Sequence, residues 1–142
     1  MRISLIQLPF PTEGAASLRL YLWGDGEQYP VGDFLQELAK SRSKEFKRVT
    51  ALFDKMASTG KIVNQEQFKD VEGHKPLFEF KAYDVRIFCF FDERGLILVE
   101  GDIKKSNKSK DRNRQAIARA QQRFELYQMD KKAGRVEERR EY

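Results

Sequence analysis

The sequence predicts an α+β fold, in which an antiparallel sheet packs against an N-terminal helix pair and a C-terminal helix. Three observations indicate this class. Two stripes of apolar residues at helical spacing lie between residues 31 and 56. Three strand-like runs follow within residues 77–103, and a further helical stripe begins at residue 117. This order of a helix pair, a group of strands and a closing helix is typical of helices layered over a sheet.

The N-terminal part of the chain predicts two short extended segments. Residues 1–8 are expected to form a strand or an ordered arm that Pro9 and Pro11 end. Residues 17–23 alternate apolar and polar side chains, as a half-buried strand does. The Gly-Asp-Gly of residues 24–26 is a strong turn signal and ends this strand.

Two helices are expected next, joined by a short link, which favours an antiparallel pair. The first begins at Pro30, because proline is well tolerated in the first turn of a helix. The second begins at Ser43, a residue type that caps helices, and ends at Gly60. The apolar faces consist of Val31, Phe34, Leu35 and Leu38 in the first helix, and Phe46, Val49, Phe53 and Met56 in the second. Residues 61–76 are mostly polar and are expected to form a loop with a short turn of helix.

The three strand-like runs are residues 77–81, 85–91 and 96–103. A hairpin turn joins the last two runs, and its Gly95 suits a positive φ. The middle run is apolar on both faces, so we expect it at the centre of the sheet. Arg86 is the exception on this strand, and a buried arginine is costly unless it reaches an open cleft or a partner.

The last helix is expected to begin near Ser109 and to present an apolar stripe made of Ile117, Ala120, Phe124 and Tyr127. After Gln128 the periodicity is lost, which predicts a frayed, charged tail. The chain is therefore expected to consist of an extension (1–16), one domain (17–128) and a tail (129–142).

The charge of the chain is concentrated in one block. Of 142 residues, 27 are Lys or Arg and 22 are Asp or Glu, giving a net charge of +5. Residues 104–123 alone carry +7, from Lys104, Lys105, Lys108, Lys110, Arg112, Arg114, Arg119 and Arg123 against Asp111. A solvated helix face explains such a block, but its density favours a phosphate-binding surface.

Composition also excludes several classes of protein. No apolar run approaches the roughly 18 residues of a membrane-spanning helix, and the N-terminal apolar stretch is too short for a signal peptide. We expect a soluble cytoplasmic protein. With Cys89 as the single cysteine and His74 as the single histidine, neither a disulfide framework nor a multi-histidine metal site is expected. His74 is expected in a loop and Cys89 in the core, and no cofactor or metal is predicted.

The remaining chemistry lies in cations beside the sheet. Lys104 and Lys105 follow the last strand, and Arg86 lies on the neighbouring strand, with Tyr83 at the turn before it. These groups suit metal-independent RNA cleavage by the 2′-hydroxyl of the substrate. Lys or Tyr would transfer protons, and the cations would stabilise charge on the phosphate. A plain RNA-binding surface fits the same groups, and the sequence leaves the general base open.

Residues 77–109 resemble the phage-derived, HigB-like branch of the RelE/ParE toxin superfamily. The resemblance rests on three motifs: Leu77, Phe78, Glu79 and Lys81; then Arg86, Ile87 and Phe88; then Gly101, Ile103, Lys104, Lys105 and Lys108. The closing helix is similar through Ile117, Ala120, Arg123 and Tyr127. The resemblance covers roughly residues 17–128. Where the family often has His before the glycine and an aromatic residue after it, this chain has Glu100 and Asp102.

The resemblance implies a RelE-like fold and a toxin of a type II toxin–antitoxin pair. Such a toxin cleaves mRNA on the ribosome and is silenced by a cognate antitoxin, commonly a helix-turn-helix protein. It implies catalytic roles for Arg86, Lys104 and Lys105, to which we add Tyr127. The expected RNA or phosphate contacts are Lys81, Tyr83, Lys108, Lys110, Arg112 and Arg119. A non-catalytic binding protein and a ParE-like gyrase inhibitor remain alternatives, because fold does not dictate chemistry. The sequence leaves the oligomeric state open.

Overall fold

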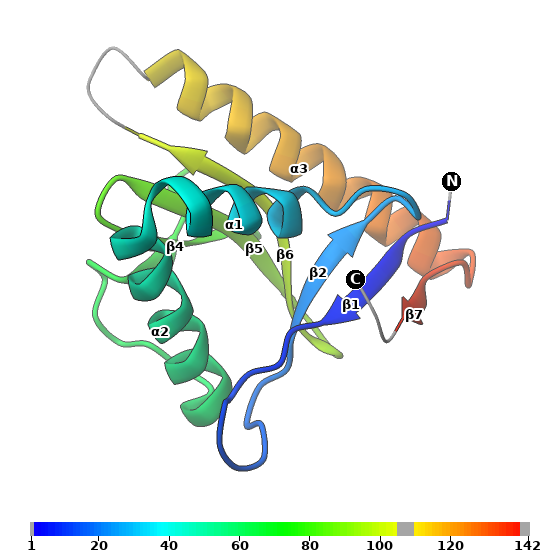
Figure 1. The fold of residues 1–142 in the computed structure, drawn as a ribbon. Helices are drawn as coiled ribbons and strands as arrows, with labels where there is room; N and C mark the ends of the chain where they lie inside the picture. Colours follow the sequence, from blue (N-terminus) through cyan, green and yellow to red (C-terminus); the bar gives the residue numbers. More distant parts are fainter. Residues whose placement is uncertain (1, 105–109, 140–142) are drawn as a thin grey trace.

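The structure, a computed structural model, describes residues 2–104 and 110–139, with the side chains of the last helix described from Asn113 onward. Its elements in chain order are β1 (Ser4–Gln7), β2 (Leu20–Gly24), α1 (Pro30–Ser41), α2 (Ser43–Thr59), β3 (Phe68–Asp70), β4 (Phe78–Ala82), β5 (Val85–Asp92), β6 (Gly95–Ile103), α3 (Lys110–Lys132) and β7 (Glu137–Arg139). The strands form one sheet in the order β3-β4-β5-β6-β2-β1-β7. The α1–α2 pair lies on one face of the sheet and α3 on the other (Figure 1).

The α+β class and the placement of the helices are confirmed, and the element order agrees with a RelE-like architecture at a coarse level. The sheet is mixed, however, and not wholly antiparallel. β2 runs parallel to β6, and β1 runs parallel to β7. The parallel β2–β6 pairing has a physical reason: the chain leaves β2, passes through the helix pair and the hairpins, and returns beside β2 in the same direction.

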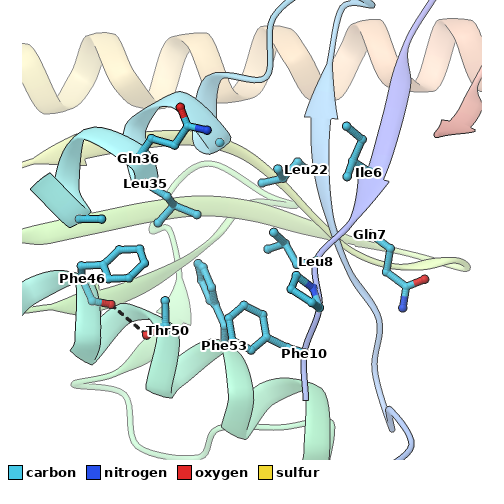
Figure 2. A pocket seen from close by; sticks show the side chains of 13 residues that line it. Ile6, Gln7, Leu8, Phe10, Leu22, Leu35, Gln36, Phe46, Thr50 and Phe53 are labelled. Atoms are coloured by element: carbon cyan, nitrogen blue, oxygen red, sulfur yellow. Dashed lines mark hydrogen bonds between the residues drawn. The ribbon is translucent and has the colours of Figure 1, made fainter. Parts of the chain in front are cut away.

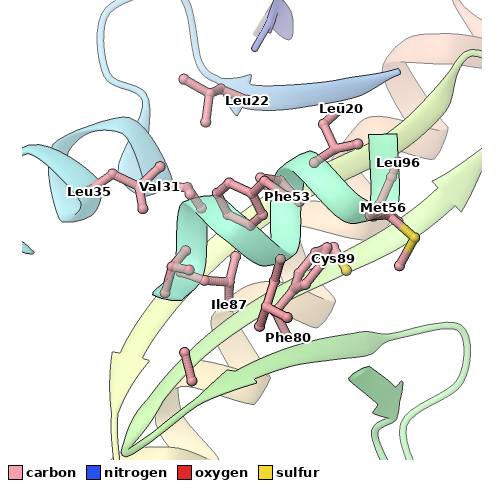
Figure 3. Packing of buried hydrophobic residues seen from close by; sticks show 14 of the residues in the cluster. Leu20, Leu22, Val31, Leu35, Phe53, Met56, Phe80, Ile87, Cys89 and Leu96 are labelled. Atoms are coloured by element: carbon pink, nitrogen blue, oxygen red, sulfur yellow. The ribbon is translucent and has the colours of Figure 1, made fainter. Parts of the chain in front are cut away.

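Each face of the sheet buries its own apolar core. On the α1–α2 side, Phe53 and Met56 of α2 pack over Phe80, Ile87 and Cys89 of the central strands (Figure 3). On the α3 side the core consists of Ile3, Leu5, Tyr21, Trp23, Val71, Leu77, Phe88, Phe90, Ile97, Val99, Ala116, Ala120 and Tyr127. Since β5 pairs with both β4 and β6 and contributes to both cores, its predicted central position is confirmed.

The turn residues behave as their chemistry predicts. Gly60 ends α2 in the left-handed conformation, with φ of 80°. Gly95 closes the β5–β6 hairpin opposite Asp92 with φ of 153°. A Cβ atom on Gly95 would collide with the carbonyl oxygen of Arg19, so this turn has no room for a side chain.

Two expectations about irregular segments are wrong. The predicted loop of residues 61–76 contains β3, which pairs with β4 at the edge of the sheet. The frayed tail after Gln128 is replaced by the last turns of α3 and by β7, which pairs with β1. Three-residue strands are too short to show a period in the sequence, and their pairing partner is remote along the chain.

A buried carboxylate anchors the C-terminal segment to the N-terminal strand. Asp130, almost fully buried, accepts hydrogen bonds from the backbone N–H of Ile3 at 2.9 Å and from Arg135 at 2.9 Å. Residues 3–7, expected to belong to an extension, therefore lie inside the sheet between β2 and β7, with Ile3 and Leu5 fully buried.

Candidate functional site

Charged side chains converge at the end of the sheet where β4, β5 and β6 meet the β4–β5 turn. The strand register places Lys81 opposite Arg86, and Arg86 opposite Asp102. Side chains two residues apart on a strand share a face, so Glu79 lies on this same face of β4. We call these residues, together with Lys104 just beyond β6, the polar sheet end. It lies on the α3 side of the sheet, beside the helix that packs over β5 and β6.

Arg86 is held in place by three acceptors. Its Nε lies 3.3 Å from Oε1 of Glu79, and both side chains are nearly buried. Its Nη1 donates to the carbonyl oxygens of Tyr83 at 2.8 Å and Val85 at 2.9 Å. The lone arginine of the central strand thus has the partner that its burial requires. Its guanidinium is a cation of fixed orientation at this end of the sheet, with 14% of the side chain exposed.

Glu79 is the site residue that the sequence interpretation did not assign. Burial raises the pKa of its carboxyl above the ordinary value, although Arg86, Lys69, Lys81 and Lys104 all act to lower it. A carboxyl group with a raised pKa beside several cations suits proton transfer. The sequence held part of the signal: Glu79 alternates with two phenylalanines on β4, which places it on the opposite face. Its proximity to Arg86 depends on the strand register.

Two of the predicted contact residues, Lys81 and Tyr83, and the predicted catalytic residue Lys104 lie at or next to this end. Lys81 is half-buried, and Lys104 is exposed, with its backbone N–H donating to the carbonyl oxygen of Asp84 at 2.6 Å. Tyr83 lies in the β4–β5 turn, 57% exposed. The ammonium of Lys44 lies 4.6 Å from the centroid of the Tyr83 ring. Lys81, Arg86 and Lys104 thus lie at the same end of the sheet.

Four of the expected residues have no described side chain. Lys105 and Lys108 lie outside the described residues. Lys110 and Arg112 belong to the first turn of α3, and their side chains also lie outside the description.

Tyr127 lies at the other end of the sheet. Its hydroxyl donates to Oδ2 of Asp92 at 2.9 Å, and Asp92 is six residues from Arg86 along β5, a separation of roughly 20 Å. Burial, together with the hydrogen bond to Asp92, raises the pKa of Tyr127 well above its ordinary value. Tyr127 is fully buried in the α3-side core. The geometry therefore makes it a packing residue and separates it from the polar sheet end.

Arg119 is engaged by Glu100, one of the two carboxylates that depart from the family pattern. Glu100 forms ion pairs with Arg119 and, at 3.2 Å, with Arg123. Arg123 also donates to the carbonyl oxygen of Val99 at 2.7 Å. Both arginines of the basic block are thus engaged within the molecule, although the single carboxylate balances only one of their two positive charges. Of the two departures, Asp102 alone belongs to the polar sheet end, where it accepts a hydrogen bond from Asn113.

The other residues that the sequence singled out lie away from the polar sheet end. His74 is exposed in the loop before β4, and Cys89 is fully buried with its thiol pKa raised by burial, as a packed thiol should be. In the described part of the chain, no group of three or more His, Cys, Asp and Glu side chains is arranged to hold a metal ion. No helix among residues 2–104 and 110–139 is long and apolar enough to cross a membrane.

Two pockets bear on the functional assignment, the first by exclusion. The larger, of about 490 Å³, lies between α1, α2 and the segment after β1, where Leu8 and Phe10 face Phe46 and Phe53 (Figure 2). No charged side chain lines it, so it does not offer the cations that a nucleic acid requires. The second, of about 360 Å³, lies at the edge of β4 and is lined by Lys81 and Tyr83. The chain matches no protein-family model and no curated protein. Its functional assignment therefore rests on its own residues.

Proposed function

We propose that this chain is the toxin of a type II toxin–antitoxin pair and that it cleaves mRNA at the polar sheet end. The observation that carries the proposal is the Glu79–Arg86 pair, a carboxyl of raised pKa beside a fixed guanidinium, flanked by Lys81 and Lys104. The resemblance of residues 77–109 to HigB-like toxins supports the same assignment. A cytoplasmic location, a helix-turn-helix antitoxin and the ribosome as the place of cleavage belong to this proposal.

The proposed reaction uses the 2′-hydroxyl of the substrate as nucleophile. The Glu79 carboxylate takes the 2′ proton, and the 2′ oxygen bonds to phosphorus as the bond to the 5′ oxygen breaks. Arg86 and Lys104 stabilise the charge that grows on the pentacoordinate phosphate. A lysine ammonium, from Lys81 or Lys104, supplies the proton for the leaving oxygen. The products are a 2′,3′-cyclic phosphate and a 5′-hydroxyl.

Exchanging the proposed base tests this assignment. In cells, induction of the wild-type chain should stop growth and produce new RNA ends carrying a 5′-hydroxyl. Glu79→Gln keeps the shape of the side chain and should lower cleavage by about 100-fold or more, since general-base catalysis contributes 10²–10⁴. The matched control is Glu37→Gln, an exposed carboxylate on α1, which should cleave as the wild type does.

Arg86→Ala tests the cation in the same way, with the exposed Lys47→Ala as its control. Folding is verified by circular dichroism and by the melting temperature of each purified variant. Full toxicity of a correctly folded Glu79→Gln, Arg86→Ala double variant would contradict the proposal.

A second function, nucleic-acid binding without cleavage, is favoured by one observation. The guanidinium of Arg86 already contacts Glu79 and two carbonyl oxygens, so a substrate phosphate must compete with them. Under this alternative, induction produces no new RNA ends, and binding weakens steeply with salt. DNA damage without new RNA ends would instead indicate a gyrase inhibitor.

A further inference from the structure

A polar pocket lies at the outer edge of β4, next to the polar sheet end. It encloses about 360 Å³ and is lined by Arg48 of α2, Asn64, Glu66 and Gln67 of the segment before β3, and Lys81 and Tyr83 of β4 and its turn. The segment is held against the strand because the backbone N–H of Lys81 donates to the carbonyl oxygen of Gln67 at 2.8 Å. The pocket therefore has a fixed wall on the sheet and a second wall on the helix.

Tyr83 presents an aromatic surface at the rim of this pocket. The residue adopts a left-handed backbone conformation, with φ of 57°, at the first position of the two-residue turn that joins β4 to β5, where a positive φ is favoured. Its ring is 57% exposed, whereas most large aromatic side chains of the described residues are buried. An exposed ring on a turn of restrained conformation is a stacking platform for a flat ligand.

Side chains of the segment before β3 bring hydrogen-bond acceptors to the pocket lining. Oε1 of Gln67 is buried and has no hydrogen-bond partner among the described residues. A buried acceptor without a partner is costly, so a side-chain conformation in which the Gln67 carboxamide turns toward the pocket and accepts from a ligand is favoured. Glu66 adds a carboxylate to the lining. Oδ1 of Asn64 already accepts a hydrogen bond from the backbone N–H of Glu66 at 2.9 Å. These acceptors suit a ligand edge that carries an amino group.

Cations lie on both walls. Arg48 lines the pocket from α2 and Lys81 from β4, and the ammonium of Lys44 contacts the Tyr83 ring. Among the lining side chains two cations face the single carboxylate of Glu66, and Lys44 adds a further cation beside the aromatic ring. A ligand that stacks on the ring, donates from an amino group and carries an anion has the chemistry of a nucleotide.

We propose that this pocket holds one unstacked nucleotide of the RNA substrate, with its base on the Tyr83 ring, its amino group on Gln67 and its phosphate on Arg48 and Lys81. The inference rests on the proposed function, in which RNA is the substrate. Because Lys81 borders both the pocket and the polar sheet end, the bound nucleotide lies beside the scissile phosphate. The pocket selects a base with an exocyclic amine over uracil, which has none.

The experiment measures binding of the wild-type chain to fluorescent 2′-O-methyl hexanucleotides, which lack the 2′-hydroxyl and are not cleaved. The cytidine and uridine hexamers are a matched pair of pyrimidines that differ in the exocyclic amine. The cytidine hexamer should bind about fivefold more tightly, as one hydrogen bond allows. Tyr83→Ala should weaken both hexamers by about tenfold, and Tyr83→Phe should restore both.

Two further variants separate the roles of the base and the phosphate. Gln67→Ala keeps the backbone bonds of its residue and should remove the preference for cytidine while leaving uridine binding unchanged. Arg48→Ala should lower the slope of log affinity against log salt by about 0.7, the value for one phosphate contact of a single strand. Its neighbour on α2, the exposed Lys47→Ala, is the matched control and should leave the slope unchanged.

The outcomes distinguish this inference from the proposed function. If induced cells show new RNA ends but the Tyr83, Gln67 and Arg48 variants bind both hexamers as the wild type does, the pocket assignment is overturned and the cleavage assignment stands. If the variants behave as expected but no new RNA ends arise, the pocket stands as an RNA site and the nuclease assignment fails. If the chain binds an acidic peptide through this pocket and neither hexamer, the nucleotide is the wrong occupant.

Discussion

The substitution Tyr127→Phe separates a structural role of this residue from the catalytic role that its sequence position suggested. The Tyr127 hydroxyl donates to Asp92 at 2.9 Å in the α3-side core. Asp92 also accepts from Lys131 at 2.7 Å and from the backbone N–H of Arg94 at 3.2 Å. Removing the hydroxyl therefore deletes one of three bonds to a carboxylate that is almost fully buried.

The expected cost follows from these contacts. A hydrogen bond to a charged group contributes about 1.5–3 kcal/mol to stability. Because two other groups still donate to Asp92, we expect the lower end of this range. For 142 residues, an unfolding entropy of about 2.1 cal/mol/K per residue converts 1.5 kcal/mol into a fall in melting temperature of about 5 °C. The ring itself is retained, so the packing against Phe90 at 5.2 Å between centroids is unchanged.

The cost should depend on pH in a defined window. Burial alone would raise the pKa of Asp92, but the hydrogen bonds from Lys131 and Tyr127 outweigh it and lower that pKa. This contribution to stability is present above the unfolded pKa of about 3.9 and is lost as the pH falls through the folded value. Because the pKa of Tyr127 is raised, its contribution is present below about pH 10 and is lost as the pH rises through the folded value. The difference between wild type and Tyr127→Phe should be largest from about pH 5 to 9.

Thermal unfolding at several pH values and RNA cleavage in cells check this prediction together. Tyr83→Phe, which removes an exposed hydroxyl, is the control and should shift the melting temperature by less than about 1 °C. Tyr127→Phe should retain cleavage within about twofold. A 100-fold loss of cleavage with an unchanged melting temperature would place Tyr127 in the chemistry and refute the reasoning.

Three further predictions concern the fold. Asp130→Ala leaves the N–H of Ile3 without its acceptor and should lower the urea-derived free energy of unfolding by about 2 kcal/mol; an unchanged value would show that β1 is not anchored there. Gly101→Ala would put a Cβ atom 2.5 Å from the ring of Phe34 and should cost about 2 kcal/mol in the same assay. In a chain that already carries Phe34→Ala, the cost of Gly101→Ala should be smaller because the colliding ring is absent, and additive costs would contradict this contact. Cys89 should not react with a thiol reagent until the chain unfolds, and rapid labelling of the native protein would show that the core is open.

Much of the fold could be predicted because its signals are periodic and local. The helical stripes of α1 and α2, the αL glycine at residue 60 and the two-faced apolar pattern of β5 each depend on neighbouring residues alone. The short strands β3 and β7 could not be predicted in this way. Their stability comes from pairing with β4 and β1, and β1 lies more than 130 residues from β7.

The candidate site, like the fold, could be predicted where its residues are close in sequence and not where their proximity depends on packing. The proximity of Arg86 and Lys104 could be predicted because they lie on consecutive strands of a hairpin, where register is nearly set by the turn, whereas Lys81 was expected there only through the family resemblance. The position of Tyr127 could not be predicted, because a helix of 23 residues extends roughly 35 Å and only its docking decides which end of the sheet each side chain reaches.

The sequence by itself thus determined the class of fold, the central strand and the cations at the polar sheet end. Only the tertiary structure decided which of the charges remain available. Glu79 approaches Arg86 from the neighbouring strand, and Glu100 forms ion pairs with both Arg119 and Arg123 of α3, balancing one of their two charges. The physical reason is that net charge adds along a chain without regard to distance, whereas ion pairing and burial depend on separations of a few ångströms.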